Sequence, residues 1–398
     1  MPHVGALPNQ RALRIIREQR KLNIAEVAEF TAISLNRLSE IESGDREPSR
    51  KQMERLAGAY GVPLYALFND AIPNLEPLPH DFRKRNPTPA ALSPRALRVL
   101  FSAEKISTYS RQLAIALGYR PRNFLANIRD ARSPDKMAML VRSLFDDWLG
   151  PRASILNFFG APEQKFASAL RLFFEGQGVV LNVNDAPEDY MGFYVNPDAG
   201  LPTIFVSRSI LSRKAQLFTL AHEIGHFLLG LEGVSNPFEA KNDIERSCNV
   251  FAAEFLAPRN TFSQVAEGFS RDMRADTRAF ISATSARTLL SRHAAGIRLV
   301  ELGYISRREY LAWREDFLAN PGNEKEIERK VFGNSNVAAV HAKRLNEIGY
   351  LSVFLSKSAI DKNIIDAHDV VEGIGLSIGL QQKAFSLAAR RIEAAIGQ

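Results

Sequence analysis

Hydrophobic positions recur along most of this chain with the three-to-four-residue spacing of α-helices. The spacing covers residues 11–68, returns over residues 94–150, and continues from residue 259 to the end of the sequence. In a helix this spacing places the apolar side chains on one face, where they can pack into a core. The pattern therefore predicts a mostly α-helical protein.

The pattern changes between residues 178 and 207. The segments GVVLNV (178–183), MGFYV (191–195) and TIFVS (203–207) are short and rich in β-branched or aromatic residues, with Asn, Asp, Pro and Gly between them. We expect these segments to form three strands of a small sheet. The mixture of this sheet with flanking helices predicts a central α+β domain within a multidomain, mostly α protein.

Prolines cluster between residues 73 and 94, and this cluster predicts a linker. After the strands, one helix is expected from Arg213 to Leu229, ended by Gly230, and another from Asp243 to Leu256, ended by Pro258. The expected organisation is an N-terminal helical module (1–70), a linker (71–92), a helical connector (93–160), the α+β domain (161–265) and a helical C-terminal region of unassigned role (266–398).

Composition narrows the functional classes only slightly. The 398 residues include 51 basic and 44 acidic side chains, and the resulting charge of +7 permits contact with nucleic acid without requiring it. A single cysteine, Cys248, excludes an internal disulfide framework and a cysteine-based zinc finger. No secretion signal and no membrane-spanning apolar run is visible, so we expect a soluble, cytoplasmic protein.

The N-terminal helices carry clear start and end residues. Ser34 and Ser49 each precede a helix whose first turn a serine side chain can cap, and Gly44 and Gly61 follow the ends of these helices. The run IESGDREPSRKQMERLAGAYGVPLYALF, within residues 13–68, resembles the Cro/cI (Xre) family of helix-turn-helix domains.

This resemblance implies that the helix after Ser34 enters the major groove of double-stranded DNA and that the protein binds as a homodimer. Exposed residues of that helix are expected to face base edges, and basic residues beyond it to hold phosphates. The candidates are Leu35, Asn36, Arg37 and Ser39 for the bases, and Arg46, Arg50 and Lys51 for the phosphates. The chain departs from the family at Ile24, where a glutamine often contacts the DNA backbone. The alternative is a structural or dimerising module without DNA affinity.

The segment FTLAHEIGHFLLG contains a His-Glu-x-x-His motif within a predicted helix. The i, i+4 spacing of His222 and His226 brings both imidazoles to one face, where each can donate a nitrogen to one Zn²⁺ at about 2.0 to 2.1 Å. Glu223 lies about 100° around the helix from His222, beside the metal instead of on it, so it is predicted to act as general base.

A catalytic zinc usually has three protein ligands and one open position. Glu245, near the start of the next predicted helix, is the candidate for the third ligand, and Glu254 is its rival on the opposite face of the same helix. Here the segment ERSCNVFAAEFLAP, with the motif helix and the strands before it, resembles the ImmA/IrrE family of zinc metallopeptidases over residues 165–260. The resemblance implies a zincin-like domain with Glu245 as the third ligand.

Other polar residues have open assignments. Cys248 lies near the face of Glu245 and is either a fourth ligand or a small buried residue, and Asn249 is a candidate to support a ligand histidine. Tyr190, Tyr194 or a later histidine is expected to stabilise the oxyanion. The remaining histidines are expected to have ordinary roles: His3, His80, His293, His341 and His368.

The expected reaction is hydrolysis of a peptide bond in a peptide added to the sheet edge as a strand, with Glu223 moving the proton. The fusion of a Cro-like module with such a peptidase resembles regulators of mobile elements, toxin-antitoxin loci and stress responses, in which the peptidase cleaves a repressor or antitoxin. The alternative is an inactive transcriptional regulator or antitoxin whose zincin fold is a binding platform.

Overall fold

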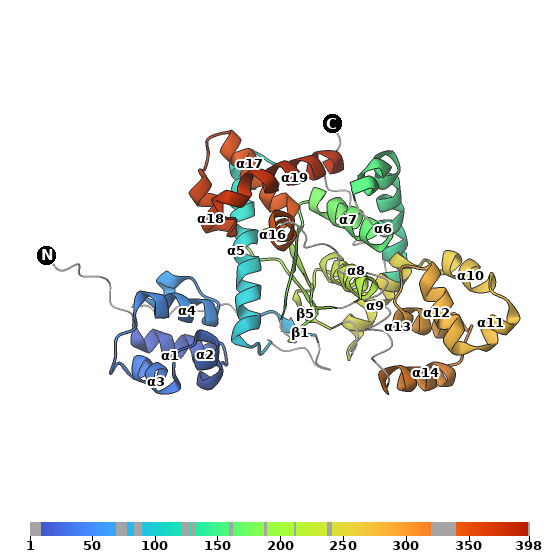
Figure 1. Cartoon of the computed structure of the whole chain (residues 1–398), viewed down its shortest axis with the longest axis horizontal. Helices are drawn as coiled ribbons and strands as arrows, with labels where there is room; N and C mark the ends of the chain where they lie inside the picture. The colour runs from blue at the N-terminus through green and yellow to red at the C-terminus, as the bar shows by residue number, and fades with distance from the viewer. Residues whose placement is uncertain are drawn as a thin grey trace.

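A computed structural model of the chain describes residues 9–68, 78–82, 90–120, 128, 133–158, 162–186, 189–210, 212–236, 241–319 and 340–396. Helices dominate these residues, and a small mixed sheet lies near the centre of the molecule (Figure 1). The predicted fold class, a multidomain, mostly α protein with a central α+β domain, is confirmed.

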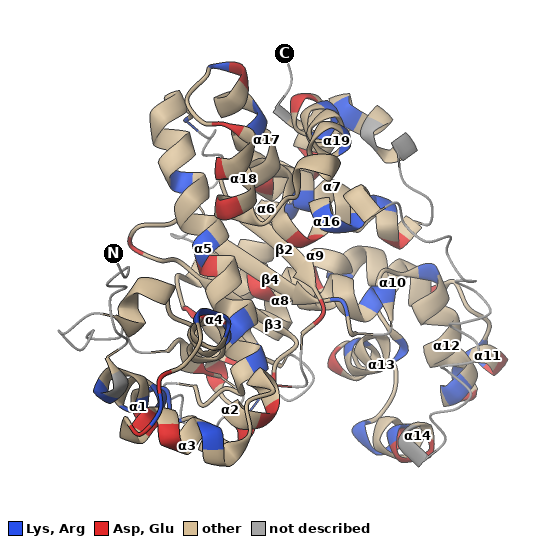
Figure 2. Cartoon of the chain, turned by 60° about the vertical axis from the view of Figure 1, so that its left-hand side comes forward, with Lys and Arg blue, Asp and Glu red and all other residues tan. Residues whose placement is uncertain are grey.

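The N-terminal module consists of four α-helices and one 3₁₀ turn around its own apolar core. The Ser34 hydroxyl accepts a hydrogen bond from Arg37 N, and Ser49 forms a reciprocal cap with Gln52, so both predicted helix starts are confirmed. Figure 2 shows basic and acidic residues interspersed over these helices. The elements are α1 (Gln10–Gln19), α2 (Ile24–Thr31), α3 (Leu35–Ser43), α4 (Arg50–Tyr60) and η1 (Leu64–Leu67).

The sheet contains the three predicted strands and two others among the described residues. Its order is β1-β5-β3-β4-β2, with β3 antiparallel to both neighbours and the outer pairs, β1 with β5 and β2 with β4, parallel. The strands are β1 (His80–Asp81), β2 (Val180–Asn184), β3 (Gly192–Val195), β4 (Thr203–Ser207) and β5 (Gly233–Ser235).

The two additional strands correct the sequence interpretation. β1 lies inside the interval predicted as linker, 71–92, and β5 follows the motif helix. Strands of two and three residues are too short to show an alternating pattern, so only pairing in the folded protein defines them.

Helices cover both faces of the sheet. Helix α8 (Arg213–Leu229) packs on one face and α5 (Pro94–Leu117) on the other, while α9 (Asp243–Leu256) packs against α8 from outside. Phe193 and Phe205 are directly opposed across β3 and β4 and stack at 4.7 Å on the α5 side. The apolar faces of α4 and α5 pack together, so the N-terminal core continues onto the sheet.

The remaining helices form two groups on different sides of the central domain (Figure 1). The interval 266–398, predicted as one region, therefore divides in the structure. Near α9 lie α10 (Arg259–Glu267), α11 (Arg271–Ala275), α12 (Thr277–Arg287), α13 (Arg292–Glu301) and α14 (Arg307–Ala319). Around β2 and α5 lie α7 (Pro162–Gly176), α16 (Val340–Ile348), α17 (Tyr350–Asp361) and α18 (Ala367–Ile374), with α19 (Ile378–Ile396) packed on α17. Helix α6 (Pro134–Leu149) packs against α9, and η3 (Gly150–Phe158) contacts α6, α7 and α19.

A buried ion pair joins the C-terminal helices to the central domain. Arg171 Nε donates to Glu175 Oε1 at 3.2 Å, and Arg171 also donates to the Leu181 carbonyl of β2 at 2.6 Å. The Glu175 carboxylate accepts from Tyr350 N at 3.0 Å and Leu351 N at 3.3 Å, the first turn of α17. Helix α17 has no side-chain cap of its own. Glu175, which belongs to α7, therefore accepts hydrogen bonds from the free amide groups at the start of α17.

Among the helices of the described residues, none combines the length and apolarity needed to cross a bilayer.

Replacing Glu175 with Ala should destabilise the protein by roughly 3 to 5 kcal/mol, because the change leaves Arg171 buried without its carboxylate and two helix amides unpaired. The free energy of unfolding in urea tests this. The matched control is Glu301→Ala, whose carboxylate pairs with Arg298 but is 40% exposed, and it should cost about 1 kcal/mol or less. Equal effects of the two changes would contradict the structural role of Glu175.

Candidate functional site

The candidate site is formed where α8 and α9 meet under the sheet. Helix α8 spans Arg213–Leu229, the predicted limits, with Ser212 capping its start and Gly230 following its end, and it carries His222, Glu223 and His226. Helix α9 contributes Glu245 from its first turn. All four side chains are 0% exposed, although each is polar or charged. Such groups are stable in a protein interior only when they satisfy one another or bind a metal ion.

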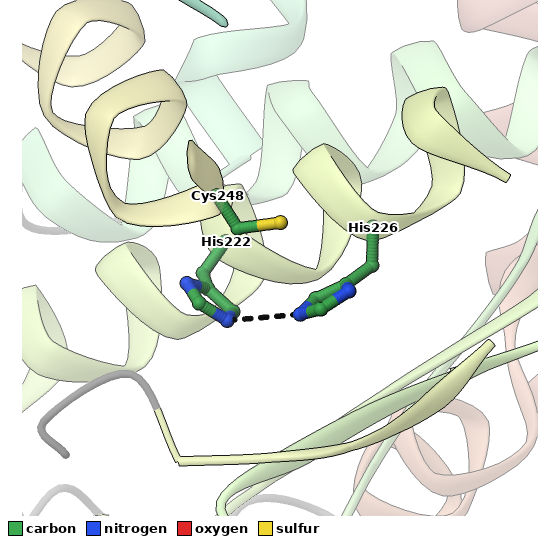
Figure 3. A group of neighbouring side chains, drawn as sticks. All are labelled: His222, His226 and Cys248. Atoms are coloured by element: carbon green, nitrogen blue, oxygen red, sulfur yellow. Dashed lines mark hydrogen bonds between the residues drawn. The ribbon is translucent and has the colours of Figure 1, made fainter. Parts of the chain in front are cut away.

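Three of these side chains converge. The Nε2 atoms of His222 and His226 lie 3.1 Å apart, and a dashed line marks this contact in Figure 3. Glu245 places one carboxylate oxygen 3.2 Å from His226 Nε2 and the other 3.4 Å from His222 Nε2. The structure therefore brings together the residues predicted as ligands, and we refer to His222, His226 and Glu245 as the donor cluster.

The donor cluster fits a tetrahedral zinc ion. With ligand bonds of about 2.0 to 2.1 Å, tetrahedral geometry separates neighbouring ligand atoms by about 3.3 to 3.4 Å. The two histidine nitrogens lie 3.1 Å apart, and each lies 3.2 to 3.4 Å from one of the two oxygens of the Glu245 carboxylate. Two imidazoles and one carboxylate are also a donor set that zinc accepts at catalytic sites.

Burial and pairing set the charges of the cluster. Burial alone would raise the pKa of Glu245, but hydrogen bonds and charge from both histidines hold it at about 2, so this carboxyl stays ionised. Burial disfavours the charged form of His222 and so lowers its pKa. The hydrogen bond and the negative charge of Glu245 raise the same pKa by more, so the net shift of the His222 pKa is upward. For His226 burial prevails, and its pKa is lowered. The cluster thus combines a fixed negative charge with two ring nitrogens.

Neighbouring residues orient each histidine. His222 Nδ1 lies 2.8 Å from Asn249 Oδ1, the contact expected of a residue supporting a ligand histidine. When Nδ1 donates this bond, the Nε2 lone pair points into the cluster. His226 is covered by Phe82, whose ring stacks on the imidazole at 4.9 Å with an interplanar angle of 16°. Sequence reasoning missed Phe82, because it follows β1 in the predicted linker.

Glu223 is held beside the cluster by the sheet. The Ser235 hydroxyl, on β5, donates a short hydrogen bond to Glu223 Oε1, and Oε2 is buried without a hydrogen-bond partner among the described residues. Burial raises the pKa of Glu223 to about 8. A β-carbon at Gly192 would lie 2.4 Å from Glu223 Oε1, so glycine is required on β3 for this approach. Neither Ser235 nor Gly192 was identified from the sequence.

The two rival ligands occupy different positions. Glu254 forms a short ion pair with Arg298 and accepts from Arg259 N at 3.0 Å, so the structure directs it toward α13, away from the histidines. Cys248 is fully buried, and its sulfur and the histidine nitrogens all lie within 4.8 Å of one another (Figure 3). Burial raises the pKa of this thiol well above its ordinary value.

Of the two tyrosines expected to stabilise the oxyanion, Tyr190 uses its hydroxyl on another element, whereas Tyr194 has a ring contact with α8. The Tyr190 hydroxyl donates to the Ala96 carbonyl on α5 at 3.0 Å, and the Tyr194 ring packs edge-on against Phe227. His293 Nδ1 lies 3.0 Å from the Tyr310 hydroxyl in the α13–α14 group. His3 lies outside the described residues. His80 belongs to β1, and its ring is 6.2 Å from that of Phe82.

The predicted DNA-contacting residues lie on α3 and at the start of α4. Leu35 is 45% exposed, and Asn36, Ser39 and Lys51 are also exposed. Arg37 is half-buried because its guanidinium donates to the Glu47 carbonyl at 2.8 Å.

Two further predicted phosphate contacts lie in exposed ion pairs. Arg46 pairs with Glu40 at 3.2 Å, and Arg50 pairs with Glu54 at 3.0 Å. Exposed pairs of this kind contribute little stability, so both arginines can exchange their partners for phosphates.

Two protein-family models match the chain. Residues 11–71 match a helix-turn-helix domain, and residues 174–300 match the IrrE N-terminal-like domain of the peptidase M78 family. The second match runs from the end of α7 to α13 and includes all four site residues. Neither a curated protein nor a solved structure matches the chain significantly. The chain is therefore a fusion of an N-terminal helix-turn-helix domain with a peptidase-family domain of the IrrE/ImmA type, in that order.

Proposed function

We propose that the chain is a zinc-dependent endopeptidase joined to a sequence-specific DNA-binding module. The observation that carries the peptidase proposal is the spacing of the donor cluster in a fully buried site. The two histidine Nε2 atoms lie 3.1 Å apart, and the Glu245 carboxylate places one oxygen 3.2 Å from His226 Nε2 and the other 3.4 Å from His222 Nε2. In this proposal His222, His226 and Glu245 hold the zinc. When bound, zinc supplies a Lewis acid that polarises water and the scissile carbonyl.

The chain's own residues then move the proton. In the proposed reaction Glu223 takes a proton from the attacking water through Oε2, while Ser235 holds Oε1 in place. The water oxygen bonds to the carbonyl carbon, the peptide C–N bond breaks, and Glu223 returns the proton to the leaving nitrogen. Asn249 holds the ring of His222 in orientation throughout.

The DNA-binding proposal rests on the exposed face of α3. Leu35, Asn36 and Ser39 project from a capped helix that the matched domain family uses to enter the major groove. Arg37 joins them after releasing Glu47. Arg46, Arg50 and Lys51 hold phosphates on either side, and a homodimer places two such helices on successive half-sites.

We infer from the fusion that the peptidase substrate is a regulatory protein, such as a repressor or an antitoxin. A second function is favoured by one observation, the complete burial of the site. A regulator that uses this domain only as a binding platform needs no access to Glu223, and all four site residues are 0% exposed. The experiments below separate the two functions.

Purified protein should contain about one zinc per chain, as measured by elemental analysis. Glu245→Ala should abolish this zinc, because the change removes one of three ligands. Asn249→Ala should lower zinc affinity about 10- to 100-fold by releasing His222. Glu254→Ala is the control: it disturbs a buried ion pair of similar depth on the same helix and should keep the zinc. Loss of zinc in Glu254→Ala but not in Glu245→Ala would reverse the assignment, and absence of zinc from the parent protein would overturn it.

Glu223→Gln should retain zinc and DNA binding while lowering the rate of substrate cleavage by about 10²-fold or more, because the amide cannot accept the proton. The substrate is found by comparing cellular proteins in strains that express either form. Glu232→Gln changes an exposed carboxylate next to β5 and should leave cleavage unchanged. If Glu223→Gln and the parent protein give the same phenotype, the peptidase-family domain acts only as a binding platform and not as an enzyme.

DNA binding should show different signatures for base and phosphate contacts. On a site selected from random duplexes, Asn36→Ala should cost about 1 to 3 kcal/mol and relax the preference at one base pair. Lys51→Ala should weaken binding to all DNA sequences alike. It should also lower by about 1 the slope of the logarithm of the binding constant against the logarithm of the salt concentration. Glu29→Ala, an exposed change on α2, is the control. Failure to select any sequence would leave a structural or dimerising module.

A further inference from the structure

A short segment between the two domains covers the candidate site. His80 and Asp81 pair with Gly233 and Val234 of β5 as a parallel strand, and Phe82 N donates to the Val234 carbonyl at 3.0 Å. This segment lies along the outer edge of the sheet (Figure 1). We refer to residues His80–Phe82 as the edge segment.

The side chain of Phe82 is the part of the edge segment that meets the donor cluster. It is 3% exposed and stacks on the His226 imidazole at 4.9 Å. Its carbonyl accepts from Asn242 Nδ2 at 2.7 Å, and Asn242 Oδ1 accepts from Glu245 N at 2.9 Å. Phe82 therefore contacts the candidate ligand His226 directly and is linked to the candidate ligand Glu245 through the side chain of Asn242.

The surface beneath Phe82 is shaped for a flat ring. A β-carbon at Gly233 would lie 2.3 Å from the Phe82 ring and 2.6 Å from the His80 carbonyl oxygen. Only glycine at this position lets an extended strand and an aromatic side chain lie directly on β5. The site thus combines backbone pairing along β5 with a specific pocket for one side chain, the combination used when a peptide adds to a sheet edge.

The paired part of the edge segment is short. The strand has two residues, below the usual strand length, and its contacts with the rest of the domain include backbone pairing, one side-chain hydrogen bond and one stacked ring. A longer peptide with the same features can form the same pairing and extend it. Displacement of the edge segment would expose His226.

We propose that the edge of β5 beside His226 is the binding subsite for an extended peptide with an aromatic side chain, and that His80–Phe82 fills this subsite in cis. The proposal rests on the proposed peptidase function for the identity of the competing peptide as substrate. The edge segment lies between the helix-turn-helix domain and α5, so the same stretch of chain that leads from the DNA-binding module closes the site.

Opening of the site can be measured without cleavage or zinc. Cys248 is the only cysteine of the chain, and its sulfur lies within 4.8 Å of the ring nitrogens that Phe82 helps to cover. In the metal-free full-length protein, Phe82→Ala should raise the rate of Cys248 labelling by 5,5′-dithiobis(2-nitrobenzoate) about tenfold or more. Phe82→Leu keeps an apolar side chain without the ring and should give a smaller increase.

Phe269→Ala is the matched control, since Phe269 is 9% exposed and packs on Phe280 in the group beside α9. It removes a similar ring without touching the site, and it should leave the labelling rate unchanged. Equal labelling rates in Phe82→Ala and the parent protein would overturn the closure. Circular dichroism confirms that each variant is folded.

Peptide binding tests the subsite itself. A fluorescein-labelled peptide with the sequence of residues 76–86 should bind Phe82→Ala at least tenfold more tightly than the parent protein, as measured by anisotropy. The same peptide with alanine in place of its phenylalanine should not bind. Equal affinity for both proteins would overturn competition in cis, and equal binding of both peptides would overturn aromatic recognition. Because neither readout uses turnover, failure here is separable from a failure of the Glu245→Ala zinc test.

Discussion

The structure around α8 depends on one constraint, the burial of two imidazoles and two carboxylates in the interior of the central domain. Buried polar groups must be matched by partners, because water is not there to solvate them. Neighbouring elements meet this requirement in two ways: two of them supply a polar side chain, and one supplies a glycine that leaves space. Ser235 of β5 satisfies Glu223, Gly192 of β3 makes room for it, and Asn249 of α9 orients His222. The ligand spacing therefore results from packing, and a zinc ion would complete it.

The same burial raises the question of how a substrate of the proposed peptidase reaches the site. The sheet edge next to His226 is covered by the chain's own segment at β1, and the ring of Phe82 lies on a candidate ligand. On the opposite face of the sheet, α5 packs against both the strands and α4 of the helix-turn-helix domain. The helix-turn-helix domain thus packs against the same helix, α5, that covers this face of the sheet.

Several elements followed from local sequence because their causes are local. The bounds of α8 and α9 matched the predicted limits, since Ser212, Gly230 and Pro258 act through the backbone of adjacent residues. The caps at Ser34 and Ser49 were found in the same way. The helical spacing of His222 and His226 placed their nitrogens together, and the choice of Glu245 over Glu254 agreed with the ion pair that occupies Glu254. Strands β1 and β5 were missed because two or three residues cannot display a period.

By itself, then, the sequence determined the mostly α architecture and the convergence of His222 and His226, because helix periodicity and capping act over a few residues. Family resemblance, carried by the sequence motifs, added the helix-turn-helix module and the third candidate ligand, Glu245. Tertiary structure decided everything that depends on chain segments far apart. Residue 82 covers residue 226, residue 235 holds residue 223, and residue 175 caps a helix that begins at residue 350. No local pattern specifies these contacts, since each arises only when the sheet order and the packing of its faces bring distant segments together.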